Sequence, residues 1–111
     1  MSPTGPKNDD GVLLAPKPAQ KAAYERRYRV VFHNDDYTTR WFVVHVLQQV
    51  FRMSETAAVA FTMAVHRKGR GVAGVYARDI AETKAETCMD LAAEFEMPLM
   101  VTAEPEDDDN R

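Results

Sequence analysis

The sequence predicts a small α+β fold, with three helices packed on one side of a three-stranded antiparallel sheet. Short runs of β-branched and aromatic residues alternate with longer segments whose apolar residues recur at helical spacing, in the order β-α-α-β-α-β. All of these segments lie between residues 25 and 104. In so short a stretch, one open sheet covered by one layer of helices buries the apolar faces of both.

The first strand is predicted at residues 28–32, where the sequence Tyr-Arg-Val-Val-Phe is β-branched and aromatic. A helix is predicted to follow from Thr39, and Trp41 falls on its polar side. The apolar face of this helix consists of Phe42, Val43, Val46, Leu47, Val50 and Phe51.

The second helix is predicted to begin after Ser54, a good N-cap that is followed by Glu55 in the first turn. Gly69 then ends the helix in the left-handed C-cap position. A short strand is predicted at residues 72–76. The inward stripe of the second helix is expected to contain Ala57, Ala58, Phe61, Ala64 and Val65.

The third helix is predicted to begin at an acidic version of a capping box, formed by Asp79 and Glu82. It stops before Pro98, and the last strand is predicted at residues 99–102. The residues expected to point inward from this helix are Ala81, Ala85, Cys88, Ala92 and Phe95.

Both ends of the chain have the composition of segments that do not pack. Residues 1–24 contain four prolines and no helical or strand period, which predicts a flexible arm. Residues 105–111 are mostly acidic, which predicts a disordered tail that repels itself. The folded core is therefore expected at residues 25–104.

The composition excludes several classes of protein. A net charge of −3 and a pI near 5.6 argue against a general nucleic-acid binder. The single cysteine, Cys88, leaves no internal disulfide and suits a reducing cytosol. No apolar run reaches the roughly 18–20 residues that span a bilayer. We therefore expect a cytoplasmic protein without membrane or nucleic-acid partners.

Three adjacent polar side chains follow the first strand. One acceptor would be enough to cap the helix behind them, but Asn34, Asp35 and Asp36 supply several. Such a surplus at a strand-to-helix junction suits a ligand that brings several donors, such as an ammonium group or a metal ion. His66, on the edge of the apolar arc of the second helix, is a further candidate.

Catalysis has weaker support in the sequence. His33, Asp35, Asp36 and His66 are acceptable metal ligands, but no His-x-x-x-His pair or HExxH frame preorganises them. Cys88 faces inward, and no serine lies in a GxSxG-type turn. We expect neither a metal nor a cofactor and no enzymatic activity. A small metal-dependent enzyme and a docking module without recognition of N-termini stay open as alternatives.

Several motifs resemble the ClpS family in order and spacing. They are NDDYT at 34–38, FVVHVL at 42–47, AVHRKGRGVAGVY at 64–76, AETK at 81–84 and PL at 98–99. ClpS proteins are adaptors that hand N-degron substrates to the ClpA-type unfoldase of the ClpAP protease. The resemblance covers the expected core and implies a monomeric adaptor for proteins that begin with Leu, Phe, Tyr or Trp.

The resemblance also implies a binding site. The free α-amino group of the substrate would be held by Asn34, Asp35, Asp36 and His66. The first side chain would enter a pocket formed by Phe32, His33, Thr38, Arg40, Val43, Thr62, Val65 and Leu99.

The chain departs from the family pattern at three positions of this region. Arg40 and Thr62 stand where methionines are usual, which alters the rim and the depth of the pocket. Trp41 stands where the family has a glutamate, so a capping box from Thr38 would lack its partner.

The resemblance implies one further surface, the contact with the N-domain of the unfoldase. The unfoldase is expected to contact a face that carries Asp79, Glu82 and Lys84, with Tyr37 and Thr38 nearby. The arm at residues 1–24 would be engaged by the unfoldase during delivery.

Overall fold

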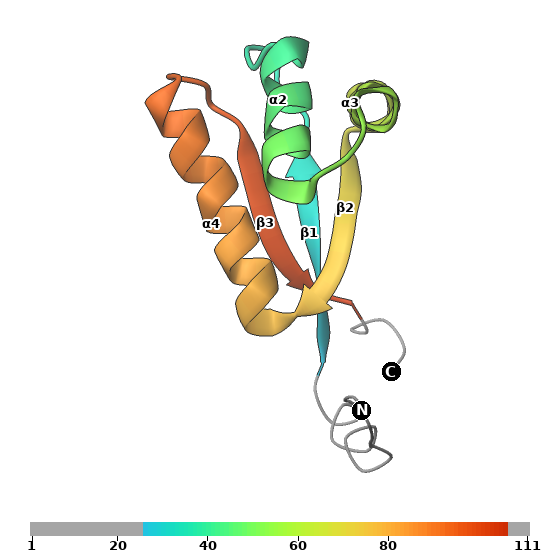
Figure 1. The fold of residues 1–111 in the computed structure, drawn as a ribbon, viewed down its shortest axis with the longest axis vertical. Helices are drawn as coiled ribbons and strands as arrows, with labels where there is room; N and C mark the ends of the chain where they lie inside the picture. Colours follow the sequence, from blue (N-terminus) through green and yellow to red (C-terminus); the bar gives the residue numbers. More distant parts are fainter. Residues whose placement is uncertain (1–25, 107–111) are drawn as a thin grey trace, which may run out of the picture.

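The computed structural model describes residues 26–106, which form a three-stranded antiparallel sheet and three helices (Figure 1). The predicted fold class is confirmed. The expected arm at residues 1–24 and residues 107–111 of the expected tail lie outside the described residues. The elements are β1 (Arg27–His33), α2 (Arg40–Phe51), α3 (Glu55–Lys68), β2 (Arg70–Ala77), α4 (Arg78–Glu94) and β3 (Met100–Pro105).

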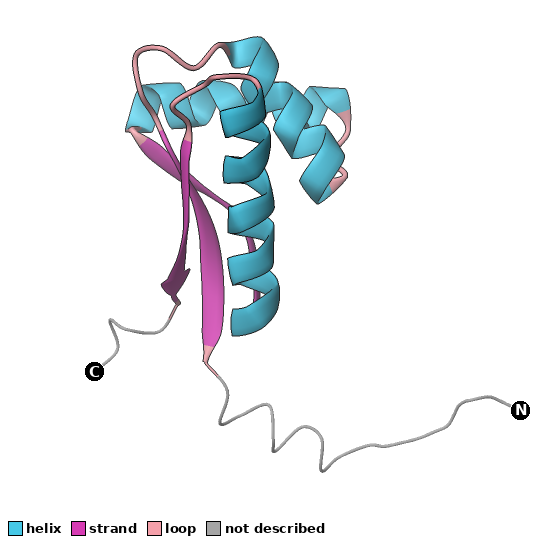
Figure 2. Cartoon of the chain, turned by 90° about the vertical axis from the view of Figure 1, so that its left-hand side faces the viewer, coloured by secondary structure: helices cyan, strands magenta, loops and turns pink. Residues whose placement is uncertain are grey.

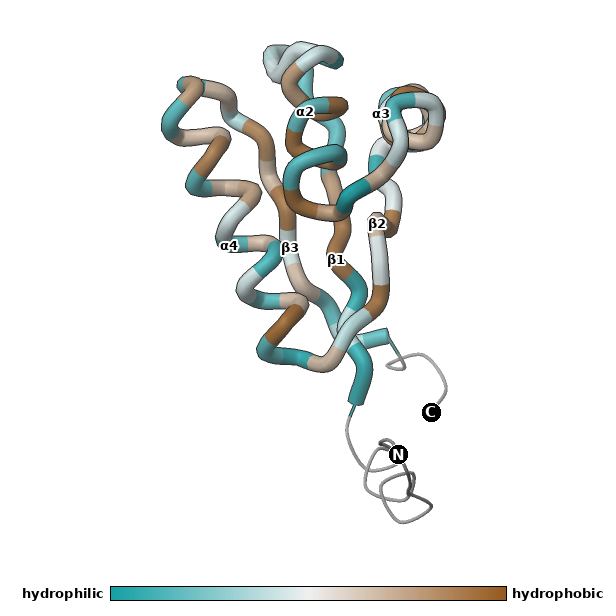
Figure 3. Tube along the Cα trace, viewed as in Figure 1, coloured by the Kyte–Doolittle hydropathy of each residue, from teal (hydrophilic) through white to brown (hydrophobic). Residues whose placement is uncertain are grey.

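The first strand is the centre of the sheet, whose strand order is β2-β1-β3. The strands form one layer and the helices lie on one side of it (Figure 2). Side chains alternate between the two faces of a strand, so Val30 and Phe32 of β1 point into the helical layer and are fully buried. Hydrophobic residues accordingly follow the middle of β1, while its lower end is hydrophilic (Figure 3).

Phe32 occupies the centre of the core. Its ring makes edge contacts with Phe51 at the end of α2 and with Phe61 in α3, both at centroid distances of 5.7 Å. Aromatic pairs in this geometry add about 0.5–1.5 kcal/mol to the burial of their surface. The last inward residue of β1 therefore fixes two helices beside the strand end.

The helix caps of the second helix are confirmed. The Ser54 hydroxyl accepts the N–H of Ala57 at 3.1 Å, and Gly69 has a φ of 95°. The first helix is capped differently from the expectation, because Thr39 rather than Thr38 accepts the N–H of Phe42, at 3.2 Å. The Thr38 hydroxyl instead donates to Asp35 Oδ2 at 2.8 Å.

The capping box predicted at Asp79 and Glu82 is wrong. Strand β2 runs directly into α4, so the helix begins at Arg78 and its N-cap, Ala77, makes no side-chain cap. Asp79 lies inside the first turn and accepts the N–H of Ile80 at 2.9 Å. Glu82 pairs instead with Arg78 at 3.1 Å.

The boundary between core and tail lies later than expected. Strand β3 reaches Pro105, which pairs with Tyr28, and the N–H of Glu106 donates to the Arg27 carbonyl at 2.8 Å. The extension accompanies the early start of β1 at Arg27, because β3 as far as Pro105 pairs with β1 from Tyr28 onward. Pro105 is tolerated because β3 is an edge strand.

Phe95 is more exposed than its expected inward orientation implies. It is the C-cap residue of α4, with 42% of its surface accessible, and its ring packs on Phe42 at 5.2 Å. Trp41 is 60% exposed, as its place on the polar side of the helix predicts. It lies 6.1 Å from the Phe95 ring.

The close approach of α3 to the sheet depends on Gly71. A Cβ atom at this position would lie 2.8 Å from Val65 Cγ2 and 3.1 Å from Phe61 Cζ. Gly71 pairs with Phe32 in the sheet, so α3 rests directly on the backbone of β2 beside the core aromatic. An added methyl group therefore requires the Val65 side chain, or α3 itself, to move.

Gly71→Ala is expected to lower the free energy of unfolding by about 1–3 kcal/mol, the usual cost of overpacking a core. Urea unfolding of the variant measures this cost. In a Val65→Ala background the same change should cost less, because the nearest clashing atom is gone. Equal costs in the two backgrounds would show that the clash with Val65 does not determine the position of α3.

Candidate functional site

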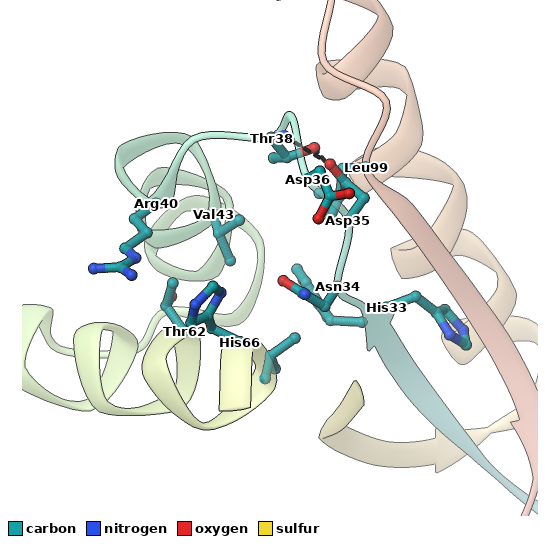
Figure 4. A pocket seen from close by; sticks show the side chains of 12 residues that line it. His33, Asn34, Asp35, Asp36, Thr38, Arg40, Val43, Thr62, His66 and Leu99 are labelled. Atoms are coloured by element: carbon teal, nitrogen blue, oxygen red, sulfur yellow. Dashed lines mark hydrogen bonds between the residues drawn. The ribbon is translucent and has the colours of Figure 1, made fainter. Parts of the chain in front are cut away.

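A pocket with a cavity volume of about 190 Å³ lies where the end of β1, the start of α2 and the end of α3 meet. Its size is below the roughly 300–1,000 Å³ of most cofactor and drug sites, so it suits a single side chain. The structure brings together at this pocket all the residues predicted for amino-group binding and for the side-chain pocket (Figure 4). They are Phe32, His33, Asn34, Asp35, Asp36, Thr38, Arg40, Val43, Thr62, Val65, His66 and Leu99.

The floor of the pocket is apolar. Phe32, Val65 and Leu99 are buried there beside the half-buried Val43. Thr62 is also buried, and its hydroxyl donates to the Ala58 carbonyl one turn earlier at 2.8 Å. The hydroxyl hydrogen is therefore already used within α3, and the floor offers a ligand apolar contact rather than a donor.

The Asp35 carboxylate forms hydrogen bonds within its own loop. Its Oδ1 accepts the N–H groups of Tyr37 and Thr38 at 2.8 and 2.7 Å, and its Oδ2 accepts the Thr38 hydroxyl at 2.8 Å. Partial burial would raise the pKa of this carboxyl, but the hydrogen bonds from Thr38 and Tyr37 outweigh it and lower the pKa below its usual value. Asp35 therefore holds the loop in shape and has little capacity left for a ligand.

The other polar groups of the rim are free to bind a ligand. Within residues 26–106, the side chains of Asn34, Asp36 and His66 are exposed and form no hydrogen bond or ion pair. Figure 4 shows the Asn34 amide pointing across the pocket toward His66. Of the two acids, Asp36 is thus the one whose carboxylate has no partner in the region that the structure describes.

A backbone hydrogen bond sets Asn34 opposite His66. The Asn34 N–H donates to the Gly69 carbonyl at 2.9 Å, and the Gly69 N–H donates to the Val65 carbonyl at 2.8 Å. The end of β1 is thereby tied to the last turn of α3, which carries His66. The sequence did not reveal this contact, because a backbone carbonyl acceptor has no side-chain signature.

His33 borders the pocket, but its imidazole points away from it (Figure 4). Phe32 faces the helices, so the next side chain of the strand lies on the opposite face of the sheet. There His33 Nε2 donates to the Thr102 hydroxyl at 2.9 Å, which in turn donates to Glu104 Oε2 at 3.0 Å. Arg70 completes this network with a 2.7 Å ion pair to Glu104.

The pKa of Glu104 reflects the same network. Partial burial would raise the pKa of Glu104, but the hydrogen bonds from Arg70 and Thr102 and the nearby charges lower it below its usual value. The network links all three strands at the end of the sheet where β1 enters the pocket.

The predicted unfoldase surface is divided by the fold. Asp79, Glu82 and Lys84 lie in the first half of α4, at one end of the molecule, whereas the loop with Tyr37 and Thr38 lies at the other (Figure 1). The expectation that Tyr37 and Thr38 are near the α4 residues is therefore wrong. The reason is that β2 carries the chain back along the sheet before α4 begins.

Lys84 has an intramolecular role. Its ammonium donates to the Val50 carbonyl in the last turn of α2 at 3.2 Å and lies 5.2 Å from the centre of the Tyr76 ring. No basic residue lies in the last turn of α2 itself. Lys84 therefore supplies the positive charge that favours a helix C-terminus, from a neighbouring helix.

The described residues contain neither a metal-binding cluster nor an activated cysteine. Among residues 26–106, no three His, Cys, Asp or Glu side chains meet where they could hold a metal ion. Burial raises the pKa of the Cys88 thiol to about 12, so a nucleophilic thiolate does not form there near neutral pH. Within the same range, no helix combines the length and the apolar character needed to cross a membrane.

Comparisons with known proteins agree on one family. The model of the family "ATP-dependent Clp protease adaptor protein ClpS" matches residues 23–102. The ClpS adapter of Myxococcus xanthus (strain DK1622) is 48% identical over 101 residues, which cover 91% of this chain and 94% of that protein. The ClpS 2 adapter of Agrobacterium fabrum is 50% identical over 102 residues, which cover 90% and 99%.

A solved structure is similar as well. Agrobacterium tumefaciens ClpS2 bound to L-phenylalaninamide superimposes with a TM-score of 0.72 and is 51% identical. The match covers 74% of this chain and 99% of that one.

The two neighbouring acids are expected to respond differently to mutation. Asp35→Ala removes three hydrogen bonds of a partly exposed carboxylate and should lower the free energy of unfolding by about 1–2 kcal/mol at pH 7. The lowered pKa of Asp35 means that this contribution is present above its unfolded pKa and is lost as the pH falls through the folded value. Urea unfolding between pH 7 and pH 2 should therefore show a smaller loss on acidification in the variant.

Asp36→Ala is the matched control for this measurement, since the Asp36 carboxylate has no partner among residues 26–106. Its stability should stay close to that of the parent protein across the same pH range. Equal destabilisation by both variants would contradict the assignment of Asp35 to the loop.

Proposed function

The chain belongs to the ClpS family of Clp protease adaptors, and from this premise we propose that it binds proteins with a bulky apolar first residue and delivers them to a Clp unfoldase. One observation carries the proposal. The rim of an apolar pocket presents three polar side chains, Asn34, Asp36 and His66, that have no partner among residues 26–106. Polar groups without a partner among the described residues, placed around an apolar floor, suit a ligand with a polar head and an apolar side chain.

The free N-terminus of a protein has this chemistry. Its α-amino group has a reference pKa near 7.7–8.0, so it is largely an ammonium with three N–H donors at neutral pH. The Asn34 carbonyl oxygen, the Asp36 carboxylate and a neutral His66 imidazole are all acceptors. Each hydrogen bond to a charged group contributes roughly 1.5–3 kcal/mol. In this proposal Asp35 positions the other groups through the loop and does not bind the ammonium itself.

The floor of the pocket accounts for the side chain of the first residue. Phe32, Val43, Val65, Leu99 and the Thr62 methyl group would surround it with apolar surface. The similar ClpS2 structure supports this arrangement, because L-phenylalaninamide carries a free α-amino group and a phenyl ring. Peptides that begin with Phe, Tyr, Trp or Leu are the proposed ligands.

The adaptor itself performs no reaction in this proposal, and ATP hydrolysis and proteolysis belong to its partners. We propose that the start of α4 contacts the N-domain of a ClpA-type unfoldase. Asp79 and Glu82 are exposed there, beside Ile80, which is 48% exposed. Lys84 would stabilise this surface indirectly, because its hydrogen bond to the Val50 carbonyl joins α4 to the end of α2.

The central test uses fluorescence anisotropy with labelled peptides that begin with Phe, Tyr, Trp or Leu. Acetylation of the α-amino group removes its charge and two of its three donors, so affinity should fall at least about 10- to 100-fold for every peptide. Unchanged affinity would end the proposal of amino-group recognition and would favour a docking module. Metal analysis of the purified protein tests the enzyme alternative, since this proposal expects no bound metal.

A second test concerns the depth of the pocket. Thr62 is buried in the floor, so Thr62→Met places a longer side chain in the space that the first residue would occupy. Binding of Trp- and Phe-starting peptides should weaken more than binding of Leu-starting ones, by roughly 1–3 kcal/mol, the usual cost of overpacking. Repeating the panel with Thr62→Met and with Arg40→Met separates the floor from the rim. An unchanged ranking of first residues in both variants would mean that neither position selects the first side chain.

A further inference from the structure

The rim of the pocket has two sides of opposite charge. The proposed amino-binding side carries the Asp36 carboxylate, whereas the guanidinium of Arg40 lies on the side formed by α2 and α3, beyond Val43 and Thr62 (Figure 4). Arg40 is exposed and has no hydrogen bond, ion pair or ring contact with any residue from 26 to 106. It is the one lysine or arginine among the residues that line the pocket.

A positive charge at this position does not stabilise α2. Arg40 is the first residue of α2, and cations are unfavourable at a helix N-terminus because the helix dipole is positive there. No acid in the first turn compensates for it, and the cap is supplied by Thr39. The arginine therefore slightly opposes the stability of α2, and no described residue occupies its guanidinium, so the group is available to a ligand.

We infer that Arg40 is a specificity-determining residue that favours substrates with Asp or Glu directly after the first residue. The inference rests on the proposed function, which fixes how a substrate enters. Once the ammonium lies between Asn34, Asp36 and His66 and the first side chain fills the floor, the chain leaves over the remaining rim. The second side chain then passes the α2 side, where a guanidinium can take a carboxylate through two parallel hydrogen bonds.

The expected effect is moderate, because the pair is exposed to solvent. Exposed ion pairs contribute little, so an acidic second residue should raise affinity roughly two- to fivefold over a lysine at the same position. The difference should shrink as salt is added, since screening weakens exposed pairs most.

The experiment measures anisotropy of three labelled peptides that differ only at the second residue, Phe-Asp, Phe-Ala and Phe-Lys, with neutral residues after it. With the full chain at low salt, affinity should decrease from the Asp peptide to the Ala peptide to the Lys peptide. Adding salt to 0.5 M should reduce the differences in affinity among the three peptides. Arg40→Met should make the three affinities nearly equal, and Arg40→Glu should reverse their order. Arg67→Met is the matched control, because Arg67 is an exposed arginine of α3 outside the pocket lining, and should keep the order.

Two outcomes would overturn the inference. Equal binding of the Asp and Lys peptides by the parent protein is one, and an unchanged preference in Arg40→Met is the other. The acetylated Phe-Asp peptide separates this failure from that of the proposed function. If acetylation abolishes binding but the second residue does not affect affinity, the inferred role of Arg40 is rejected and the proposed function is retained.

Protein stability supplies an independent readout. Arg40→Glu replaces a cation by an anion at the N-terminus of α2, so the variant should unfold at the same temperature as the parent or slightly above it. A clearly lower unfolding temperature would show that Arg40 supports the fold and would overturn its assignment to the ligand.

Discussion

The hydrogen bond between the Asn34 N–H and the Gly69 carbonyl holds the site together, because it joins the end of β1 to the end of α3. Gly69 can take this position only with its left-handed backbone, which ends the helix and turns the chain into β2. From there β2 pairs with β1, with Gly71 next to Phe32. One turn thus closes the helix, starts the neighbouring strand and sets His66 opposite Asn34. The pocket lies beside this turn, between the end of β1 and the end of α3.

The three adjacent acceptors after β1 serve two purposes that a single residue could not combine. Asp35 uses both of its oxygens on the loop, which gives the turn a fixed shape without any contribution from a ligand. Asn34 and Asp36 lie on either side of it, and their side chains have no partner in the described part of the chain. A loop that is already ordered loses less conformational entropy when a ligand binds, so more of the interaction energy appears as affinity. In the proposed site the middle residue, Asp35, would therefore contribute to binding through the rigidity of the loop rather than through contact with the ligand.

Much of the fold could be predicted from local patterns. The helical period of α2, the Ser54 cap and the glycine at the end of α3 each have a local cause that the sequence displays. The membership of the pocket followed from the family resemblance, because residues from β1, α2, α3 and the segment before β3 meet only in three dimensions. The carbonyl contact of Gly69 could not be predicted, since backbone groups are the same in every residue. Which of the two acids would bond to its own loop was also not evident, because Asp35 and Asp36 have the same side chain. The orientation of His33 could have been predicted from the alternation of side chains along β1, once Phe32 was assigned to the core.

In the proposed function, binding of the ammonium and selection among substrates depend on different parts of the chain. Asn34 and His66 are fixed by the backbone bond at Gly69, so their placement follows from the fold itself. Arg40 and Trp41 project from the first turn of α2, where the cap comes from Thr39 and neither side chain is buried. Trp41 stacks on His45 at 5.5 Å with nearly parallel rings, a contact along the surface of the helix rather than into the core. If the proposal holds, substitutions at the start of α2 would change which substrates are preferred while the proposed amino-group site keeps its geometry. This separation explains how the chain can keep the family's polar motif at residues 34–36 and depart from the family pattern at positions 40 and 41.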